Sequence, residues 1–251
     1  MGYLGLGDNI LCIGLVRELA ERYDEVMVVC KSHYIINMEL FYRGNNKIKL
    51  FSVVDDNCIS PAFGFPESDF KKITHGYDVY KAGIHNYTHI SDFPFSFYDD
   101  CGIARENLWK KFLVPLQKES RQLFDLVRGT KYVFIHNISS TKSINLDTII
   151  NKLNISDDTL IINPCVNPYS EGNTYTKIAA QFINHPLANY IDTIINADKI
   201  FMIDSSFLCM SINCNINTDE CYYSTRGDFD YFKNIYLDNN NLKKFTKLHI
   251  S

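Results

Sequence analysis

The chain has 251 residues, of which 46% are hydrophobic and 22% are charged, and this composition predicts a soluble globular protein with one large core or two small ones. The formal net charge is -4 at pH 7 and neither half of the chain is basic, which speaks against a protein that binds nucleic acid. No apolar run reaches the roughly 18 to 20 residues that a membrane-spanning helix needs, and the N-terminus lacks a secretory signal, so we expect no membrane span and a cytoplasmic location.

The eight cysteines form no C-x-x-C pair, and a chain of this length does not depend on disulfides for a stable core. We therefore expect reduced and mostly buried thiols, with no metal site.

The first part of the chain alternates between helical and strand patterns. A glycine-rich opening leads into a helix at residues 10–22, a strand at 26–30, a helix at 32–41 and a strand at 48–54. This rhythm is typical of a parallel α/β sheet. Residues 55–97 are rich in Pro, Gly, His, Tyr and Asp, as long functional loops often are.

The same rhythm restarts after a polar, helix-prone stretch at residues 115–128. Strands are expected at 131–136, 159–163 and 199–204, and helices at 145–153, 186–197 and 206–212. Two such runs predict a GT-B-like α/β fold with two Rossmann-like domains, residues 1–114 and 115–251, and a cleft between them. Ligands of these sheets bind at the carboxyl ends of the strands, which directs attention to three turns.

The first turn is Gly5-Leu6-Gly7-Asp8-Asn9. It is not a dinucleotide fingerprint, because Ile10 stands where the third glycine of G-x-G-x-x-G belongs. Its glycines let backbone approach a ligand closely, and the helix that follows offers free N–H groups to an anion. Asp8 is expected either at the mouth of the cleft or simply as the N-cap of that helix.

The second turn follows the strand at 131–136 and combines His136 with Ser139, Ser140, Thr141 and Lys142. Hydroxyl groups and exposed N–H groups beside a cation make a phosphate cradle. The alternative is a polar loop in which Ser143 or Asn145 caps the next helix, with His136 as a hydrogen-bonded core histidine.

The third turn, Asp204-Ser205-Ser206-Phe207, joins a strand directly to an apolar helix. Two hydroxyl groups and the first amides of the helix can hold a diphosphate there without a metal ion. An N-cap alone needs only one of these residues.

These turns resemble those of the ADP-heptose lipopolysaccharide heptosyltransferase type of GT-B glycosyltransferase. The resemblance is carried by Gly5-Leu6-Gly7-Asp8 entering a helix, by the strand ending at His136 with Lys142 after it, and by Asp204-Ser205-Ser206 entering an apolar helix. The chain is similar above all to uncharacterised viral and microbial glycosyltransferase-like proteins, for which Pro94-Phe95-Ser96-Phe97-Tyr98 is a further matching segment. In a viral protein the expected location is the host cytoplasm.

The resemblance implies an inverting, metal-independent transfer of a sugar from a nucleotide-diphosphate sugar to a glycan hydroxyl. It implies that Asp8 is the general base, that residues 1–114 face the acceptor and that residues 115–251 hold the donor. Apart from the substrate no cofactor is expected. The donor-binding set that we expect is Gly7, Asn9, His136, Ser139, Ser140, Lys142, Asp204, Ser205, Ser206, Phe207 and Arg226.

Three other functions stay open at this point. A metal-dependent GT-A transferase would use Asp55-Asp56 or Asp228-Phe229-Asp230, and a nucleotide-sugar epimerase could share the scaffold. The third is a non-catalytic glycan-binding or scaffolding domain. No strand precedes the glycine turn, which suggests a piece of a larger chain, and a homo-oligomer is a further possibility.

Overall fold

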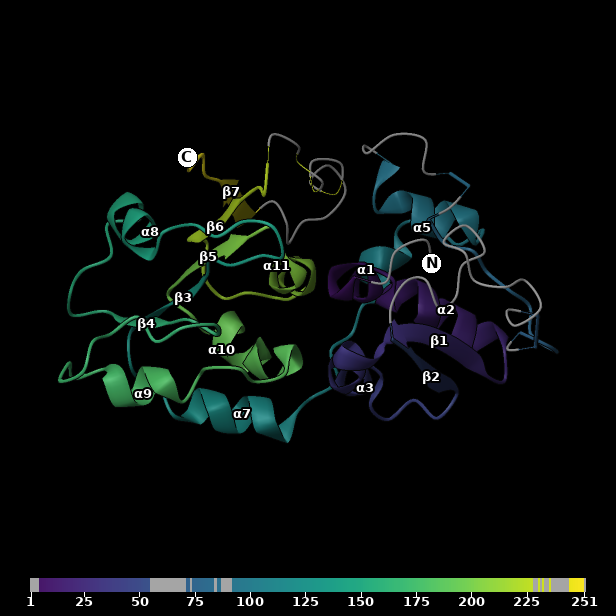
Figure 1. The fold of residues 1–251 in the computed structure, drawn as a ribbon, viewed down its shortest axis with the longest axis horizontal. Helices are drawn as coiled ribbons and strands as arrows, with labels where there is room; N and C mark the ends of the chain where they lie inside the picture. The colour runs from purple at the N-terminus through teal and green to yellow at the C-terminus, as the bar shows by residue number, and fades with distance from the viewer. Residues whose placement is uncertain are drawn as a thin grey trace. The chain divides into compact units, whose positions relative to one another are not determined.

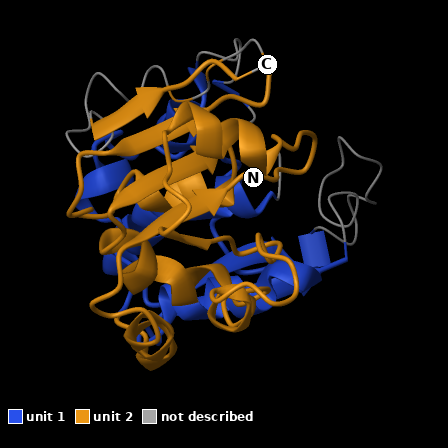
Figure 2. Ribbon diagram, turned by 90° about the vertical axis from the view of Figure 1, so that its left-hand side faces the viewer, with its two compact units in different colours: residues 1–115 blue, residues 116–251 orange. Residues whose placement is uncertain are grey.

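A computed structural model describes residues 5–54, 71–72, 74–83, 85–86, 92–227, 230, 232, 235 and 244–250. The chain forms two compact units, residues 1–115 and residues 116–251, which Figure 2 distinguishes by colour. Each unit contains a parallel sheet and helices, so the predicted α/β class is confirmed, and the parallel sheets are consistent with a Rossmann-like fold. The roles of the two units as acceptor and donor domains stay predictions.

Unit 1, residues 1–115, is built on a two-stranded parallel sheet (Figure 1). Its described elements are α1 (Leu6–Leu11), α2 (Ile13–Arg22), β1 (Val26–Lys31), η1 (Ser32–Tyr34), α3 (Ile35–Tyr42), β2 (Ile48–Val53), α5 (Phe95–Asp100) and α6 (Asn107–Lys110). The strands pair in register from Val26 with Ile48 to Lys31 with Val53. The helical segment η1 and α3 makes the crossover between them, as the sequence pattern predicts.

The first helix begins at Leu6, four residues earlier than the pattern predicts, and it is interrupted at Cys12. Gly5 is extended and its N–H donates to the Asp8 carboxylate at 3.2 Å. Sequence patterns hid this start because glycine disfavours helix interiors, whereas Gly7 lies in the first turn. Residues 7–9 therefore belong to the helix and do not form a turn ahead of it.

The interruption between α1 and α2 has a side-chain cause. The Tyr98 hydroxyl donates to Leu11 O at 2.8 Å, and this is the carbonyl that an unbroken helix would pair with the Leu15 N–H. Gly14 is needed on the same stretch, because a Cβ there would lie 1.8 Å from Asn107 O of α6. The segment 94–98, which the sequence resemblance singled out, thus supports the first helices of unit 1 from within the core.

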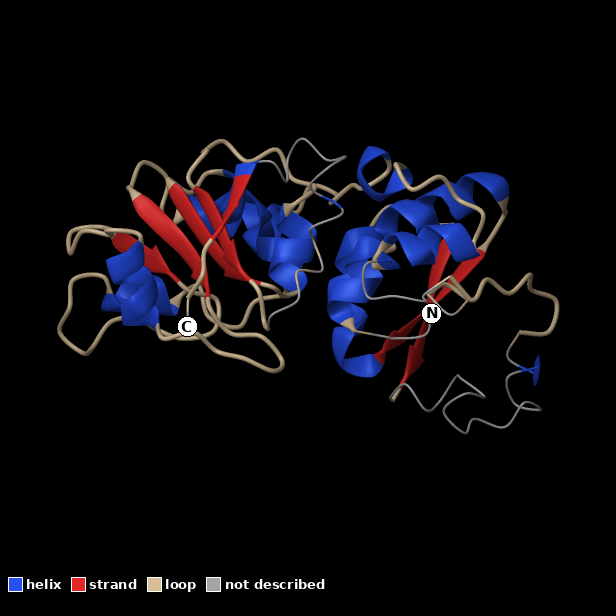
Figure 3. Ribbon diagram, turned by 90° about the horizontal axis from the view of Figure 1, so that it is seen from above, coloured by secondary structure: helices blue, strands red, loops and turns tan. Residues whose placement is uncertain are grey.

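Unit 2, residues 116–251, holds a five-stranded, fully parallel sheet in the order β4-β3-β5-β6-β7. Its described elements are α7 (Lys118–Asp125), β3 (Tyr132–His136), α8 (Leu146–Lys152), β4 (Leu160–Ile162), α9 (Thr176–Ala180), η5 (Leu187–Tyr190), α10 (Ile191–Ile195), β5 (Lys199–Ile203), α11 (Ser206–Ser211), β6 (Cys221–Ser224) and β7 (Phe245–Lys247). Figure 3 shows helices on both faces of these strands.

Alternate side chains of β3 and β5 build a core on each face of this sheet. Val133 and Phe201 pack with Ile149 of α8 on one face. On the other face Phe134 contacts the rings of Tyr190 and Phe207, with centroids 6.0 and 5.8 Å away. Strands buried on both faces are typical of a parallel sheet covered by helices.

Several short elements were not predicted. The strands β6 and β7 and the helices α5, α6 and α9 span three to six residues each, too few for a clear periodic pattern. The helix expected at 186–197 is a 3₁₀ turn, η5, followed by α10. Of the eight cysteines, the seven in the described part are free thiols and six of those are buried. In the same part, no helix is long and apolar enough to cross a membrane.

Candidate functional site

The candidate site lies at the carboxyl edge of the sheet of unit 2. β3 and β5 are adjacent and parallel, and His136 at the end of β3 is in register with Met202 near the end of β5. β6 lies on the other side of β5 and ends at Ser224. The segments that follow these strands, residues 137–142, 204–207 and 225–227, therefore begin at the same edge.

The first link across this edge joins His136 to Ser205. The Ser205 hydroxyl and His136 Nδ1 are 3.0 Å apart, and the His136 ring lies against the Phe207 ring with centroids 4.3 Å apart. Burial lowers the pKa of His136 to about 4, so the imidazole is neutral near pH 7. Ser205 precedes α11, but its side chain does not cap the helix. His136 and Ser205 are thus uncharged and contribute a hydrogen bond and apolar surface to this edge.

The second link joins Arg226, Asp204 and Ser140. Arg226 Nε lies 3.2 Å from Asp204 Oδ2, and Arg226 Nη1 lies 3.5 Å from Ser140 Oγ. Asp204 is only 3% exposed, and this burial raises its pKa while the neighbouring guanidinium opposes the rise. Arg226 is therefore a fixed cation, held by a buried carboxylate, and not a solvated surface residue.

The turn after β3 is closed by its own hydrogen bonds. The Ser139 hydroxyl donates to Lys142 O at 2.9 Å and accepts the Lys142 N–H at 3.1 Å. The side chain of Asn145 accepts the Thr148 N–H at 3.2 Å and caps α8, as one of the two sequence interpretations expected. The Lys142 ammonium has no hydrogen-bonding or ionic partner among the residues the structure describes, so it is available to a ligand.

Ser206 is the first residue of α11, which is only six residues long. A helix this short offers few aligned peptide dipoles, so Arg226 and Lys142 are stronger candidates than the helix end for contacting an anion. The hydroxyl of Ser206 is a neutral group at the start of this helix.

The remaining predicted residues, Gly7, Asp8 and Asn9, lie at the start of α1 in unit 1. The Asp8 carboxylate accepts the Gly5 N–H, and the Asn9 amide donates to Gly5 O at 3.0 Å. Asn9 is 1% exposed, and its Oδ1 is buried without a hydrogen bond in the described part of the chain. Asn9 thus holds the first turn together from inside unit 1.

The acidic pairs proposed for a metal ion are only partly described. Asp55, Asp56, Asp228 and Phe229 lie outside the described residues. Asp230 accepts the Tyr223 hydroxyl at 2.8 Å and pairs with Lys247 at 3.1 Å. No group of three or more potential metal-ligating side chains occurs in the described ranges.

The partners of Arg226 and Asp230 could not be found from the sequence. Asp230 also lies close enough to raise the pKa of Asp204, and Lys247 belongs to β7. These residues meet because β6 and β7 extend the sheet beyond β5, and both strands are too short to be recognised by their pattern.

The chain matches no protein-family model, no curated protein and no solved structure. The resemblance to heptosyltransferase-type enzymes that the motifs suggest therefore stays a prediction.

Proposed function

We propose that the protein is a GT-B glycosyltransferase that moves a sugar from a nucleotide-diphosphate sugar to a glycan hydroxyl. The observation that carries the proposal is the linkage of the three strand ends in unit 2: Arg226 to Asp204 and Ser140, and Ser205 to His136. A fixed cation and hydroxyl groups at the carboxyl edge of a parallel sheet suit a diphosphate.

In this proposal unit 2 binds the donor and Arg226 and Lys142 face its two phosphate groups. Asp204 positions Arg226, because a buried carboxylate fixes the guanidinium that it pairs with. Ser140, Ser205 and Ser206 supply neutral hydrogen bonds, and the Phe207 ring keeps the His136 imidazole in place. No metal ion is required, since two cations already offset the diphosphate charge.

The reaction that we propose is a single inverting displacement. The acceptor hydroxyl attacks the anomeric carbon of the donor, its proton passes to the Asp8 carboxylate, and the bond from the anomeric carbon to the phosphate oxygen breaks. The nucleoside diphosphate leaves with the electron pair of that bond. Arg226 and Lys142 stabilise the negative charge that develops on it.

A thermal-shift panel with UDP, GDP, ADP, CMP and their sugars, with and without Mn²⁺, tests the donor site. A ligand that binds only the folded protein raises its melting temperature. We expect one nucleoside diphosphate to do so equally with and without Mn²⁺. The double variant Lys142→Ala with Ser206→Ala should weaken its binding by at least about tenfold, as expected for loss of a charged hydrogen bond and a neutral one. Lys152→Ala with Ser156→Ala, outside the site, is the matched control.

Arg226→Ala is less useful in this test, because it would leave the buried Asp204 carboxylate without its cation and destabilise the fold. Unchanged calorimetric affinity in the Lys142 and Ser206 double variant would place the donor elsewhere. Transfer that requires Mn²⁺ would favour the GT-A alternative.

The same panel identifies the donor for an assay of the general base. Asp8→Asn should abolish transfer and leave nucleotide affinity within about twofold of wild type, because the variant loses the proton acceptor but keeps the donor contacts of unit 2. Asp24→Asn, at an exposed position, is the control. Full activity of Asp8→Asn would remove Asp8 from the mechanism, and nucleotide or glycan binding without any turnover in the wild type would favour a non-catalytic domain.

A further inference from the structure

A pocket with a volume of about 520 Å³ lies within unit 1, away from the residues discussed above. It is bounded by α2, by the turn before β2 and by the segment after α6. Lys47 comes directly before β2 and Ala20 lies in the last turn of α2, so the pocket is at the amino ends of the two strands. Asp8 lies at the opposite end of the helical run that forms α1 and α2.

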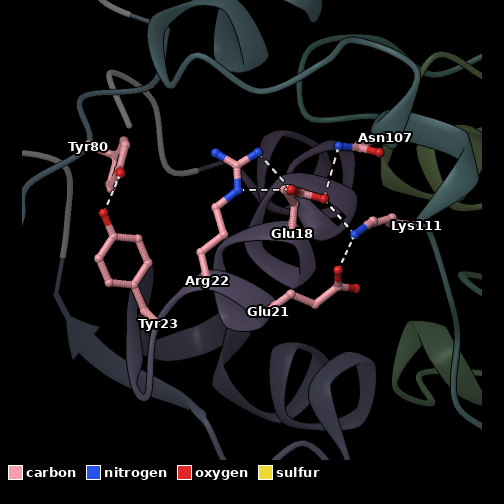
Figure 4. Close-up of polar contacts among 7 residues, drawn as sticks. All are labelled: Glu18, Glu21, Arg22, Tyr23, Tyr80, Asn107 and Lys111. Atoms are coloured by element: carbon pink, nitrogen blue, oxygen red, sulfur yellow. Dashed lines mark hydrogen bonds and ion pairs between the residues drawn. The ribbon is translucent and has the colours of Figure 1, made fainter.

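Two of the lysines at this pocket already have carboxylate partners. Lys111 Nζ lies 2.5 Å from Glu18 and 2.5 Å from Glu21, and Figure 4 shows the ammonium between the two carboxylates. Lys110 pairs with Glu106 at 2.9 Å. These ion pairs leave little charge for a ligand.

Arg17 and Lys47 are different. Arg17 Nη2 donates to Phe41 O at 3.0 Å and to Leu113 O at 3.3 Å, and Lys47 Nζ donates to Tyr23 O at 3.0 Å. Main-chain carbonyls fix the positions of these two side chains but do not neutralise them. Within the described part of the chain neither has a carboxylate partner, so two positive charges at the pocket are uncompensated.

Arg17 is also half-buried, and its Nε is a buried donor with no hydrogen bond to any described residue. Burial lowers the pKa of Arg17, which means that the site penalises its charge. A charge taken out of water without a counter-ion is costly, and an anion in the pocket would offset that cost.

The rest of the lining is partly apolar. Ala20, Phe112 and Leu113 line the pocket beside the two cations, and Leu113 is 54% exposed. A pocket of this volume is within the range of about 300 to 1,000 Å³ that small-molecule sites occupy, and it is larger than a phosphate ion needs.

We propose that this pocket binds an organic phosphate, with the phosphate group between Arg17 and Lys47 and the apolar part of the ligand over Ala20, Phe112 and Leu113. Two uncompensated cations match the double negative charge of a phosphate monoester. The proposal does not depend on the donor site of unit 2.

Phenyl phosphate and inorganic phosphate are the probes, titrated into the full chain by calorimetry and by ¹H–¹⁵N NMR. Phenyl phosphate should bind more tightly than inorganic phosphate, because only the ester covers the apolar lining. Its chemical-shift changes should centre on Asn45, Lys47 and Leu113. Lys47→Gln should weaken phenyl phosphate about tenfold, as expected for loss of a charged contact. Arg17→Gln is a second variant, interpreted only if its melting temperature stays near that of the wild type.

Two matched substitutions locate the binding. Lys49→Gln, on the exposed surface of β2, and Lys142→Gln, in the candidate site of unit 2, should each change the affinity by less than about twofold. No detectable binding of phenyl phosphate to the wild type would overturn the proposal, and so would an equal loss in Lys49→Gln. Binding abolished by Lys142→Gln would assign the ligand to unit 2 instead. Equal affinity for the two probes would exclude the apolar subsite.

Discussion

At the residue scale, the candidate site contains a buried neutral side chain, His136, as well as charged ones. Its imidazole lies between the Ser205 hydroxyl and the Phe207 ring, and burial lowers its pKa to about 4. A neutral imidazole cannot contribute a positive charge to an anion site at pH 7. The charge must then come from Lys142 and Arg226, while His136 keeps Ser205 in position.

The lowered pKa makes a prediction about stability. Between its ordinary pKa of 6.5 and about 4, the unfolded chain binds a proton at His136 and the folded chain does not. The free energy of unfolding therefore falls as the pH is lowered through this window. Below the window, the loss of stability that is due to His136 approaches about 3 kcal/mol. Urea denaturation gives the free energy of unfolding of the wild type and of His136→Gln at pH 7 and at pH 4. The difference in this free energy between the two proteins should shrink or reverse at the lower pH.

Asp204 acts in the opposite sense, because burial raises its pKa and its protonation favours the folded state as the pH falls. The wild type and His136→Gln both retain Asp204, so the comparison between them isolates the effect of His136 on stability. His33→Gln, at an exposed position, is the control and should follow the wild type at both pH values. A difference between His136→Gln and wild type that is the same at pH 4 and pH 7 would contradict the buried neutral imidazole.

At the scale of the elements, the turn between β3 and α8 combines a helix cap with a closed loop that carries Lys142. Asn145 caps α8 by accepting the Thr148 N–H, and Ser139 closes the turn that presents Lys142. The two sequence interpretations of this segment, a capped loop and a phosphate cradle, are therefore compatible, because different side chains serve them.

Asn145→Ala tests the cap. Loss of the side-chain acceptor should reduce the free energy of unfolding by about 1 kcal/mol, measured by urea denaturation. Asn151→Ala, at an exposed position inside the same helix, changes the same side chain without removing a cap and should be neutral or stabilising by about 0.5 kcal/mol. Equal effects of the two substitutions would mean that the Asn145 side chain does not stabilise the start of α8.

At the scale of the whole molecule, the division into two units separates the proposed functions. Of the candidate donor-binding residues, all except Gly7 and Asn9 lie within residues 116–251, and that unit has its own core on both faces of a five-stranded sheet. Asp8 and the pocket of Arg17 and Lys47 belong to residues 1–115.

Residues 116–251, expressed alone, should therefore fold and bind the nucleoside diphosphate found in the thermal-shift panel with an affinity within about threefold of the full chain. Circular dichroism during urea unfolding should show one cooperative transition, and calorimetry reports the affinity. The fragment 1–115 is the control and should not bind that nucleotide. A fragment 116–251 that unfolds without cooperativity would show that its core needs the rest of the chain.

Most long elements were predictable because their patterns are local. Apolar runs such as Tyr132–His136 and Lys199–Ile203 become strands, and the segments between the parallel strands become helices. The start of α1 was not predictable, because the bond from the Gly5 N–H to Asp8 offsets the low helix propensity of the glycines. Nor was the break at Cys12, which depends on the Tyr98 hydroxyl 87 residues along the chain from Leu11.

The sequence by itself determined the parallel α/β class and the turns at the carboxyl ends of β3 and β5. The reason is that the hydrophobic period and the alternation of strands and helices along the chain are patterns of neighbouring residues. Only the tertiary structure decided which of the polar residues meet. Arg226 contacts Asp204 and Ser140 because β6 extends the sheet beside β5, and His136 becomes neutral because Phe207 and the sheet bury it. Charge state and pairing depend on burial and on neighbours distant in the chain, which no local pattern specifies.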